Sequence, residues 1–561
     1  MSREPGGAAD LAFVSGAVYT VDAARRTAQA VAVRGGRIVA VGTDAAVRDH
    51  VGTATEVVNL GGRMLLPGFQ DSHVHAPSAG LDRLRIDLSE VHSVSSYAQR
   101  IKAYAQAHPE AEWILGGGWA MDVFPGGTPT AAALDAIVPG RPAFINNRDN
   151  HGAWVNSRAL QMAGVTRATA DPPDGRFERD DHGTPTGTLH EGAMDVVRRL
   201  IPAPTTDEIV DGLLVAQAHL HSLGITGWQD AIVGDYSTLA DSFDAYLVVA
   251  GDGRLSARVV GALWWERGRG EEQVAGLLER RSRARAGRFR ATTVKIMQDG
   301  VCENLTAALT TPYLIDGKPV GGTGISFVDP ETLRGSVRRL DAEGFQVHIH
   351  AIGDRGIREA LDAIESARAG NGMNDLRHHV AHLQVVDPAD VPRFRRLGAV
   401  ANAQPLWAAY EPQMSELTIP FLGEERSGWQ YPFGSLIRDG AQLAFGSDWP
   451  VSSPNTLWGL HVAVNRTEPR GYPYAGSDDR TEEPFLPEER IDLATGIRAY
   501  TMGSAYVNHL DDVCGSIEVG KLADLVVLDR DLFAEGEDGI ADARALLTLV
   551  EGEKVYEAPG F

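Results

Sequence analysis

The stretch Leu65-Leu66-Pro67-Gly68-Phe69-Gln70-Asp71-Ser72-His73-Val74-His75 joins an apolar run to two histidines that are one residue apart. If the run is a β-strand, its side chains alternate between faces, so His73 and His75 point the same way and can bind one cation. A chance His-x-His is expected roughly once in every two chains of this histidine content. The pair alone therefore leaves open two ordinary surface or core histidines.

Bulk composition narrows the function classes. The chain has 561 residues, 43% hydrophobic and 23% charged, which predicts one large domain with one or two smaller ones. A net charge of −23 argues against nucleic acid or an anionic membrane as a partner. We expect no membrane helix and no secretory signal. Cys302 and Cys514 lie far apart without metal-type spacing, so we predict packing roles in a reducing cytoplasm.

Strand-like and helix-like patterns divide the chain into three parts. Short β-type runs at both ends predict one small β-sandwich built from residues 1–63 and 505–561, because the ends of a domain tend to lie close together. Residues 64–504 alternate apolar runs with amphipathic stretches, the pattern of parallel βαβ units. Residues 82–220 are too long for an ordinary βα loop, and we interpret them as an inserted subdomain on the catalytic face.

Eight candidate strands favour an α/β fold of the (β/α)₈ TIM-like barrel type over an open sheet. Helices are predicted between some of them, for example over 207–223 and 330–343. The candidate strands are Met64–Phe69, Gly224–Asp230, Ala257–Leu263, Thr293–Met297, Phe345–His350, His379–Leu383, Ala399–Ala403 and Gln442–Phe445.

Four further polar residues stand near the ends of these candidate strands, where barrel chemistry gathers: Lys295, His350, His382 and Asp448. Each has an ordinary explanation: a strand-end histidine is often only hydrogen-bonded, a strand lysine often extends to solvent, and Asp448 suits a turn. Together with His73 and His75, however, they follow the order of the first, fourth, fifth, sixth and eighth strands. Coincidence is a poor explanation for six such residues that follow the order of the strands.

The order His-x-His, Lys, His, His, Asp on a barrel with a terminal β-sandwich resembles the amidohydrolase superfamily. The local sequence motifs are similar to those of its N-substituted formamide deformylase-like branch, amidohydrolase family 3. The segments that carry this resemblance are 66–75, 151–157, 185–189, Lys295 with Asp299-Gly300, 350–354 and 446–450.

The resemblance implies a divalent metal site. His73 and His75 would hold one metal with Asp448, whereas His350 and His382 would hold a second or position the substrate. Lys295 would carry an N6-carboxylate bridging two metals; the residues support this, since burial in an apolar strand favours the neutral amine that reacts with carbon dioxide. Zinc suits an imidazole-rich site without thiolates, and we expect one or two ions per chain. Asp448 would accept a proton from water and pass it to the departing amine.

Two positions near the predicted metal ligands bear on how the ligand histidines are oriented. The family often has an acidic residue before the sixth-strand histidine, where this chain has Ala381, so a carboxylate that orients His382 is missing unless His379 or another loop compensates. His348 is assigned a place behind the metal ligands, because the family ligand is the histidine directly before Ala-Ile-Gly-Asp.

Aromatic and polar residues near the predicted loops suggest a substrate wall. Trp407 belongs to the same group of aromatic residues, although some of these are expected to be core, and Asp149 has an equally good role in stabilising a turn. The candidate substrate-binding residues are Trp119, Asp149, His151, Trp154, Trp228 and Trp449.

The leading hypothesis is a metal-dependent amidohydrolase of a linear carbon–nitrogen bond, with a small N-formyl or N-acyl amine as substrate. Hydrolysis of a cyclic amide or another carbonyl derivative, or a non-hydrolytic reaction on the same metal scaffold, remains an alternative. A catalytically inactive binding protein is a remote one, since it predicts damaged ligands and all six are present. A homodimer is the default expectation from symmetry.

Overall fold

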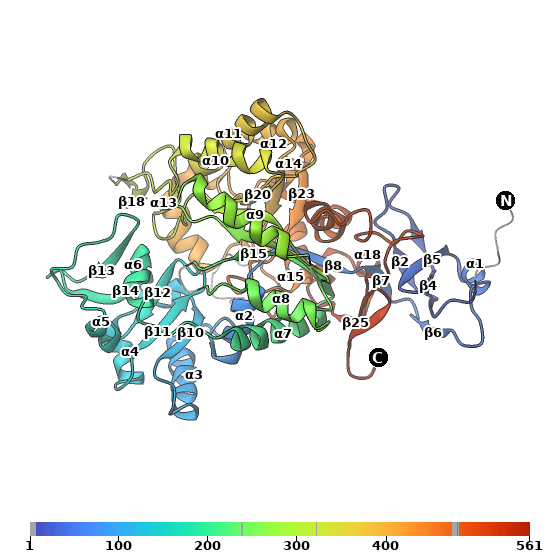
Figure 1. Ribbon diagram of the computed structural model, residues 1–561, viewed down its shortest axis with the longest axis horizontal. Helices are drawn as coiled ribbons and strands as arrows, with labels where there is room; N and C mark the ends of the chain where they lie inside the picture. Colours follow the sequence, from blue (N-terminus) through green and yellow to red (C-terminus); the bar gives the residue numbers. More distant parts are fainter. Residues whose placement is uncertain (1–6, 237–238, 286, 321, 474–479, 481) are drawn as a thin grey trace.

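Eight parallel strands form the centre of the protein in a computed structural model that describes residues 7–236, 239–285, 287–320, 322–473, 480 and 482–561 (Figure 1). Their order in the sheet follows the sequence, so the predicted (β/α)₈ barrel is confirmed. The strands are β8 (Phe69–Val74), β15 (Ile225–Val233), β16 (Arg258–Trp264), β17 (Phe289–Met297), β20 (Gln346–Ala351), β21 (His379–His382), β22 (Val400–Ala403) and β23 (Gln442–Phe445).

Hydrogen bonds link the segment after β23, the last barrel strand, to β8, the first one, and to His75 just beyond it. The Asp448 backbone N–H donates to the His73 carbonyl at 2.7 Å, and the His75 N–H donates to the Trp449 carbonyl at 2.9 Å. Asp71 on β8 adds a side-chain link, because its carboxylate accepts hydrogen bonds from the backbone N–H and the hydroxyl of Ser447. Residues from the first and last strands are thus fixed against each other.

Helices cover the outside of the barrel. In α10 (Pro330–Ala342), Asp329 caps the first turn and Leu333, Val337 and Leu340 bury one face at helical spacing. The other helices near the barrel are α2 (Ala76–Leu84), α7 (Thr206–Ser222), α8 (Phe243–Gly251), α9 (Val274–Arg283), α11 (Asp354–Asn371), α12 (Val391–Leu397), α13 (Ile419–Ser427), α14 (Phe433–Asp439), α15 (Thr456–Asn465), α16 (Leu493–Arg498) and α17 (Ser504–Val507).

The predicted first strand, Met64–Phe69, is wrong. Met64–Pro67 forms β7, which pairs with β2 and β24 of the terminal domain, and the barrel strand starts only at Phe69. Gly68 lies between the two strands, where a Cβ would lie 2.3 Å from the Thr226 Cγ2 atom, so the close packing requires a glycine. The apolar pattern missed this division because both strands are buried throughout.

Both ends of the chain build a pair of sheets around one core. One sheet has the order β5-β4-β1-β6 and the other β26-β25-β24-β7-β2-β3, and side chains such as Phe13, Leu65 and Leu547 pack between them. The elements are β1 (Leu11–Val14), β2 (Ala17–Tyr19), β3 (Thr27–Ala28), β4 (Ala30–Arg34), β5 (Arg37–Gly42), α1 (Asp44–Arg48), β6 (Glu56–Asn59), β24 (Leu525–Leu528), α18 (Leu532–Glu535), β25 (Ala545–Val550) and β26 (Glu553–Glu557).

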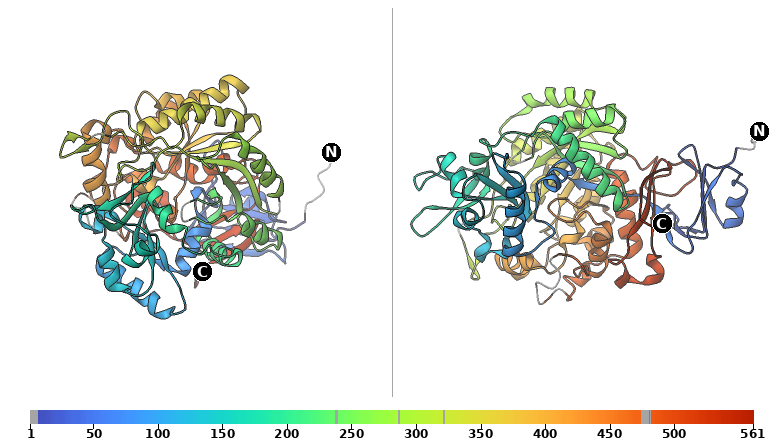
Figure 2. Two further views of the ribbon diagram at one scale, coloured as in Figure 1. Left: turned by 60° about the vertical axis from the view of Figure 1, so that its left-hand side comes forward. Right: turned by 90° about the horizontal axis from the view of Figure 1, so that it is seen from below.

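The chain between β8 and β15 forms a separate sheet with its own hydrophobic core, in the order β13-β14-β12-β11-β10-β9. This inserted subdomain lies at the opposite end of the barrel from the terminal sheets (Figures 1 and 2). Its elements are β9 (Ile86–Asp87), α3 (Val94–Ala107), β10 (Ile114–Trp119), α4 (Ala131–Ile137), β11 (Ala143–Asn147), β12 (Gly152–Val155), α5 (Ser157–Met162), β13 (Gly175–Arg179), β14 (Pro185–Glu191) and α6 (Gly192–Arg198).

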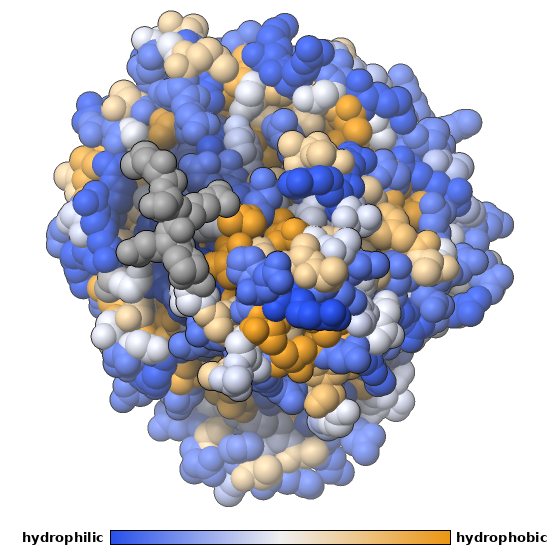
Figure 3. All heavy atoms as spheres, turned by 90° about the vertical axis from the view of Figure 1, so that its right-hand side faces the viewer, coloured by the Kyte–Doolittle hydropathy of each residue, from blue (hydrophilic) through white to orange (hydrophobic). Residues whose placement is uncertain are grey.

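The surface at the terminal-domain end is mainly hydrophilic, with a patch of hydrophobic side chains near its centre (Figure 3). Within the described ranges, no helix combines the length and the apolar character that a membrane crossing requires.

Candidate metal centre

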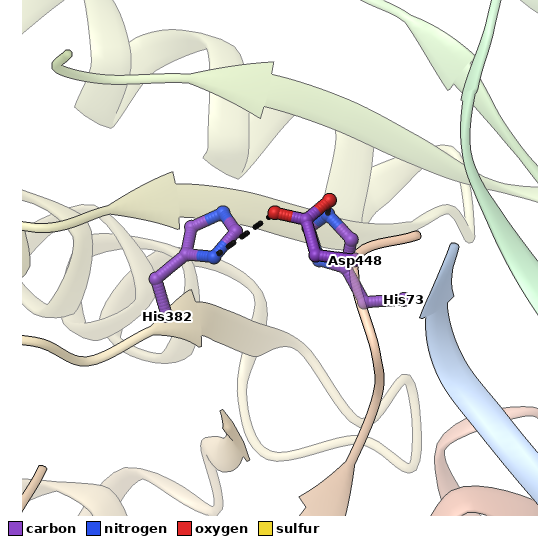
Figure 4. A group of neighbouring side chains, drawn as sticks. All are labelled: His73, His382 and Asp448. Carbon is purple, nitrogen blue, oxygen red and sulfur yellow. Dashed lines mark ion pairs between the residues drawn. The ribbon is translucent and has the colours of Figure 1, made fainter. Parts of the chain in front are cut away.

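Three side chains from the first, sixth and eighth barrel strands meet at the carboxyl end of the barrel (Figure 4). His73 lies in β8, His382 ends β21, and Asp448 follows β23. One ligand atom from each lies within 4.8 Å of the others, and all three residues are buried. Among the residues that the structure describes, this is the one such group of histidine, cysteine or carboxylate atoms.

His75 reaches the same carboxylate by a different route from the predicted one. It lies beyond the end of β8 and directly precedes α2, so strand alternation does not place it. Its Nε2 atom nevertheless lies 3.0 Å from the Asp448 Oδ1 atom, and the His73 Nε2 atom lies 3.2 Å from that oxygen. The hydrogen bond from the His75 N–H to Trp449 holds the histidine there.

Several buried polar atoms of this group lack hydrogen bonds. Both ring nitrogens of His382 and the Nδ1 atom of His75 have no hydrogen-bond partner, and Asp448 Oδ1 lies 3.2 and 3.0 Å from the Nε2 atoms of His73 and His75. Burying unsatisfied polar atoms is costly, whereas a cation would satisfy them. The donor set of imidazoles and a carboxylate fits a divalent metal of the zinc type.

Electrostatics keep the imidazoles in the form that binds metal. Burial, followed by the nearby Lys295, lowers the pKa of His73 to about 3. Burial and neighbouring cationic groups also lower the pKa values of His350 and His382 well below the usual range. Burial alone would raise the pKa of Asp448, but the surrounding histidines outweigh it and lower that pKa well below its usual value. The group therefore presents neutral imidazoles and an ionised carboxylate.

His350 and Lys295 lie beside this group on neighbouring strands. The His350 and His382 rings are 4.4 Å apart between centroids, and the His350 Nδ1 atom lies 3.3 Å from Asp299 Oδ1. Asp299 is itself fixed by the backbone N–H groups of Ala308, Ile352 and Gly353. Burial lowers the pKa of Lys295 to about 7, so an appreciable fraction is the neutral amine near neutral pH.

His348 orients a predicted ligand rather than joining the three-residue group. Its Nε2 atom lies 2.9 Å from the His73 Nδ1 atom, and its Nδ1 atom lies 2.7 Å from the Gln229 Oε1 atom. This is the arrangement by which outer partners set the ring orientation of metal ligands. His379 does not replace the acidic residue absent at Ala381, since its Nδ1 atom pairs with Asn402 at 3.0 Å.

The backbone is unusual at two of the three cluster residues. His382 has a φ of +79° and Asp448 a φ of +57°, in the left-handed region that non-glycine residues rarely adopt. Such conformations cost about 1–3 kcal/mol each and gather at functional sites. Here they turn both side chains inward as their strands end.

Trp407 closes one side of the metal centre. Its ring stacks on His382 with centroids 5.3 Å apart and planes inclined by 4°. It also lines a cavity of about 50 Å³ together with Asp149, Ile352, Gln384, Met414 and Tyr431. A second cavity of about 190 Å³ is lined by Trp449, Trp458, Tyr472 and three prolines. Trp449 thus lies beside a cavity.

Three of the predicted substrate-binding residues lie in hydrophobic cores. Trp119 and Trp154 are fully buried in the core of the inserted subdomain, where their indole N–H groups donate to the carbonyls of Ile145 and Thr130. Trp228 is buried in the barrel core and donates to the Tyr246 hydroxyl. Sequence alone does not separate core tryptophans from those in a binding site, because both kinds follow apolar strands.

Asp149 and His151 come from the inserted subdomain. The Asp149 Oδ1 atom accepts the His151 backbone N–H at 2.8 Å, which is the predicted turn-stabilising role, and the residue also lines the cavity beside Trp407. The His151 Nδ1 atom lies 2.9 Å from Glu191 Oε1, and its ring lies 5.6 Å from the His350 ring. Burial would lower the pKa of His151, but Glu191 raises it to about 9.

Sequence reasoning missed Glu191, and it named Trp407 only within the wider group of aromatic residues near the predicted loops. Glu191 ends a strand in Thr188-Leu189-His190-Glu191-Gly192, and an acidic residue at a strand end was the available signal. Trp407 follows Pro405 shortly after the seventh barrel strand, which is the position of a catalytic-face loop.

A comparison with known protein families matches residues 56–556 to the family described as the amidohydrolase family. The chain belongs to the amidohydrolase family. The predicted family is therefore confirmed, and with it the class of metal-dependent hydrolases that act on carbon–nitrogen bonds. The geometry agrees, since the histidine and aspartate cluster lies at the carboxyl end of the barrel strands.

Individual relatives of this amidohydrolase cover nearly its whole length. It is 32% identical to Protein LONG AFTER FAR-RED 3 of Arabidopsis thaliana, over 98% of this chain and 92% of that protein. It is 26% identical to N-substituted formamide deformylase of Arthrobacter pascens, over 98% of this chain and 99% of that protein. Among solved structures, an uncharacterized metal-dependent hydrolase from Pyrococcus furiosus is 26% identical with a TM-score of 0.69, covering 93% of this chain and 99% of that one.

Proposed function

We propose that this amidohydrolase uses zinc to hydrolyse a linear amide, an N-formyl or N-acyl amine. The observation that carries the proposal is the buried group of His73, His382 and Asp448 at the end of the barrel where catalysis occurs, in which both ring nitrogens of His382 lack a hydrogen-bond partner. The similarity to an N-substituted formamide deformylase over nearly the whole chain supports the choice of substrate class.

The chain's own residues would divide the work of binding the metal. His73, His75, His382 and Asp448 would hold one ion, with His350 beside them for a second ion or for the substrate. A bound divalent cation supplies Lewis acidity, which lowers the pKa of water and polarises a carbonyl group. His348 would keep the His73 ring in the ligating orientation.

Asp448 would move the proton in this reaction. A water oxygen forms a bond to the carbonyl carbon while one water proton passes to the Asp448 carboxylate. The carbon–nitrogen bond then breaks, and Asp448 returns this proton to the departing amine nitrogen. The products are a carboxylic acid and an amine, so the only net reactants are the amide and water. The low pKa of Asp448 keeps its carboxylate in the ionised form before the reaction.

Lys295 would act as its N6-carboxylate. The lysine is fully buried on β17, and its side chain makes no hydrogen bond or ion pair with the described residues. An unpaired ammonium is unfavourable there, whereas the neutral amine reacts with carbon dioxide to give an anion facing the histidines.

The size and lining of the cavities suit a small substrate with an apolar substituent. The metal group itself is buried, and the adjoining cavity of about 50 Å³ leaves room for a formyl or short acyl group. The larger cavity beside Trp449 offers aromatic and proline surfaces for the amine substituent.

The test is a substrate panel assayed with protein of known metal content. N-alkyl and N-arylalkyl formamides, the matching acetamides and cyclic amides of similar size are incubated with zinc-loaded protein, and amine release is measured. Turnover of the linear amides at least tenfold above that of the cyclic ones is expected. Full metal content with hydrolysis of cyclic amides alone would contradict the choice of linear amides.

A further inference from the structure

The inserted subdomain contributes a histidine–glutamate pair to the edge of the metal centre. His151 lies just before β12 and Glu191 ends β14, and the Glu191 backbone N–H donates to the His151 carbonyl at 3.1 Å. Their side chains meet at 2.9 Å between Nδ1 and Oε1, and both residues are buried. The pair is therefore fixed both through the backbone and through the side chains.

Loop residues of the barrel brace this pair from the other side. The Thr306 hydroxyl donates to Glu191 Oε1 at 2.9 Å, and the Asn304 amide donates to the His151 carbonyl at 3.1 Å. A Cβ at Gly300 would lie 2.6 Å from Glu191 Oε1, so this glycine is what lets the loop approach. Glu191 itself has a φ of +49°, a strained conformation for a glutamate.

Such a buried ion pair is an expensive way to stabilise a fold. Removing both charges from water costs several kcal/mol per ion, and apolar residues of similar volume often serve stability as well. The strained backbone of Glu191, the burial of both side chains and the hydrogen bonds from two parts of the chain all fix the orientation of the His151 imidazole. This pattern is typical of a group held for binding or catalysis.

The free nitrogen of His151 is the part that can act. Its Nδ1 atom is taken by Glu191, whereas its Nε2 atom has no hydrogen-bond partner within the described part of the chain. The ring stands beside His350, yet it does not belong to the group of ligand atoms formed by His73, His382 and Asp448. The Glu191 carboxylate, 2.9 Å from Nδ1, stabilises the imidazolium form of His151, and an imidazolium carries an N–H on Nε2 as well.

Amide hydrolysis leaves one developing charge without a protein partner. Asp448 handles the proton of water and of the departing amine, while the acyl oxygen becomes negative as the carbonyl carbon turns tetrahedral. A preorganised donor aimed at that oxygen contributes strongly to catalysis in acyl transfer. We propose that His151, held by Glu191, donates its Nε2–H to the acyl oxygen of the substrate, an assignment that rests on the proposed amide hydrolysis.

In this assignment His151 is a catalytic residue, and Glu191 is a positioning residue that acts through it. No proton leaves His151, which donates a hydrogen bond that strengthens as the oxygen gains charge. The inserted subdomain thereby completes the active site of the barrel instead of only covering it.

The test compares amides with thioamides, whose sulfur accepts hydrogen bonds more weakly. His151→Ala, Glu191→Gln and the wild type are assayed on an N-alkylformamide and its thioformamide, with kcat, KM and zinc content measured for each. The matched control is His190→Ala: His190 is equally buried in the same sheet, and its Nε2 atom lies 2.9 Å from Glu178 Oε1. It neighbours Glu191 in β14, so its side chain points to the opposite face.

We expect kcat on the amide to fall about 100-fold in His151→Ala, with zinc content and KM unchanged. The ratio of kcat/KM for amide over thioamide should fall about tenfold, since the lost hydrogen bond favoured oxygen. Glu191→Gln should lower the ratio in the same direction, which also covers the case in which His151→Ala fails to fold. His190→Ala should leave the ratio at the wild-type value.

Three results would overturn the assignment. Equal losses on amide and thioamide in both variants would make the pair structural, and loss of zinc in His151→Ala would make the histidine a ligand. A zinc-loaded wild type that hydrolyses no amide would refute the proposed function itself, and the assignment with it. The first two results are distinguishable from the third because the wild type remains active in them.

Discussion

The barrel and the inserted subdomain hold their histidines in different ways. In the barrel, His73, His382 and Asp448 sit at strand ends, and a backbone hydrogen bond from Asp448 to His73 fixes the spacing of these two residues. In the inserted subdomain, His151 depends on side chains from Glu191, Thr306 and Asn304 for its position. The difference teaches that the group of candidate metal ligands rests on the barrel alone, whereas the proposed contact to the substrate comes from a separate layer.

Removing the metal should have the largest effect, because it acts only on the barrel site. Dialysis against a strong chelator should abolish amide hydrolysis and lower the unfolding temperature. A ligand present at 100 times its Kd adds about 2.7 kcal/mol of stability, which is lost with the metal. Calorimetry with and without added zinc measures this, and an apoprotein that keeps full activity would contradict the metal site.

Asp448→Asn should come next, because the amide cannot accept the proton of water. We expect kcat to fall by about 10³–10⁴-fold while most of the zinc stays bound. Steady-state kinetics and metal analysis of the same preparation check both parts. Wild-type turnover in this variant would remove Asp448 from the proton pathway.

His348→Ala tests whether a residue behind the ligands tunes the barrel site. Its loss should weaken zinc binding by about 10–100-fold, since the His73 ring loses the partner that orients it. Competition with a coloured chelator measures the affinity. His379→Ala is the matched control, because that ring lies beside His348 but pairs with Asn402. Equal weakening in both variants would make the effect one of packing alone.

Trp407→Ala should have the smallest effect and the one most dependent on substrate. The ring covers His382 and lines the cavity, so its removal should raise KM about tenfold for amides with apolar substituents. Trp154→Ala is the contrasting variant, because that ring packs in the core of the inserted subdomain and should lower stability without changing KM. A similar KM in both variants would exclude Trp407 from substrate binding.

The positions of the strand-end residues were predictable because the barrel strands are apolar runs that stop at turns. Gln442–Phe445 was placed correctly, and the strands that carry Lys295, His350 and His382 differ from the prediction only at their ends. The order of these residues along a barrel therefore predicted where they meet. His75 reaches the site for another reason, because a backbone hydrogen bond to Trp449 holds it beyond the strand.

The remaining features depend on contacts between distant parts of the chain. Met64–Pro67 looked like a barrel strand because it is as apolar as one, and only its pairing with β24 assigns it elsewhere. Trp119 and Trp154 were predicted to contact the substrate because residue type alone does not show whether a tryptophan is buried in a hydrophobic core. The pairing of His151 with Glu191 requires strands β12 and β14 to be in register, which spacing alone does not reveal.

The place of β7 bears on the order in which the chain is completed during synthesis. β7 emerges from the ribosome early, directly before the strand that carries His73, yet its partner β24 lies near the other end of the sequence. Until that partner has been translated, one edge of β7 has unpaired backbone groups and is open to pairing with another chain. Assembly of the terminal sheet is thus a late event. A ribosome that stalls within the barrel releases an incomplete chain whose unpaired β7 edge can pair with other chains.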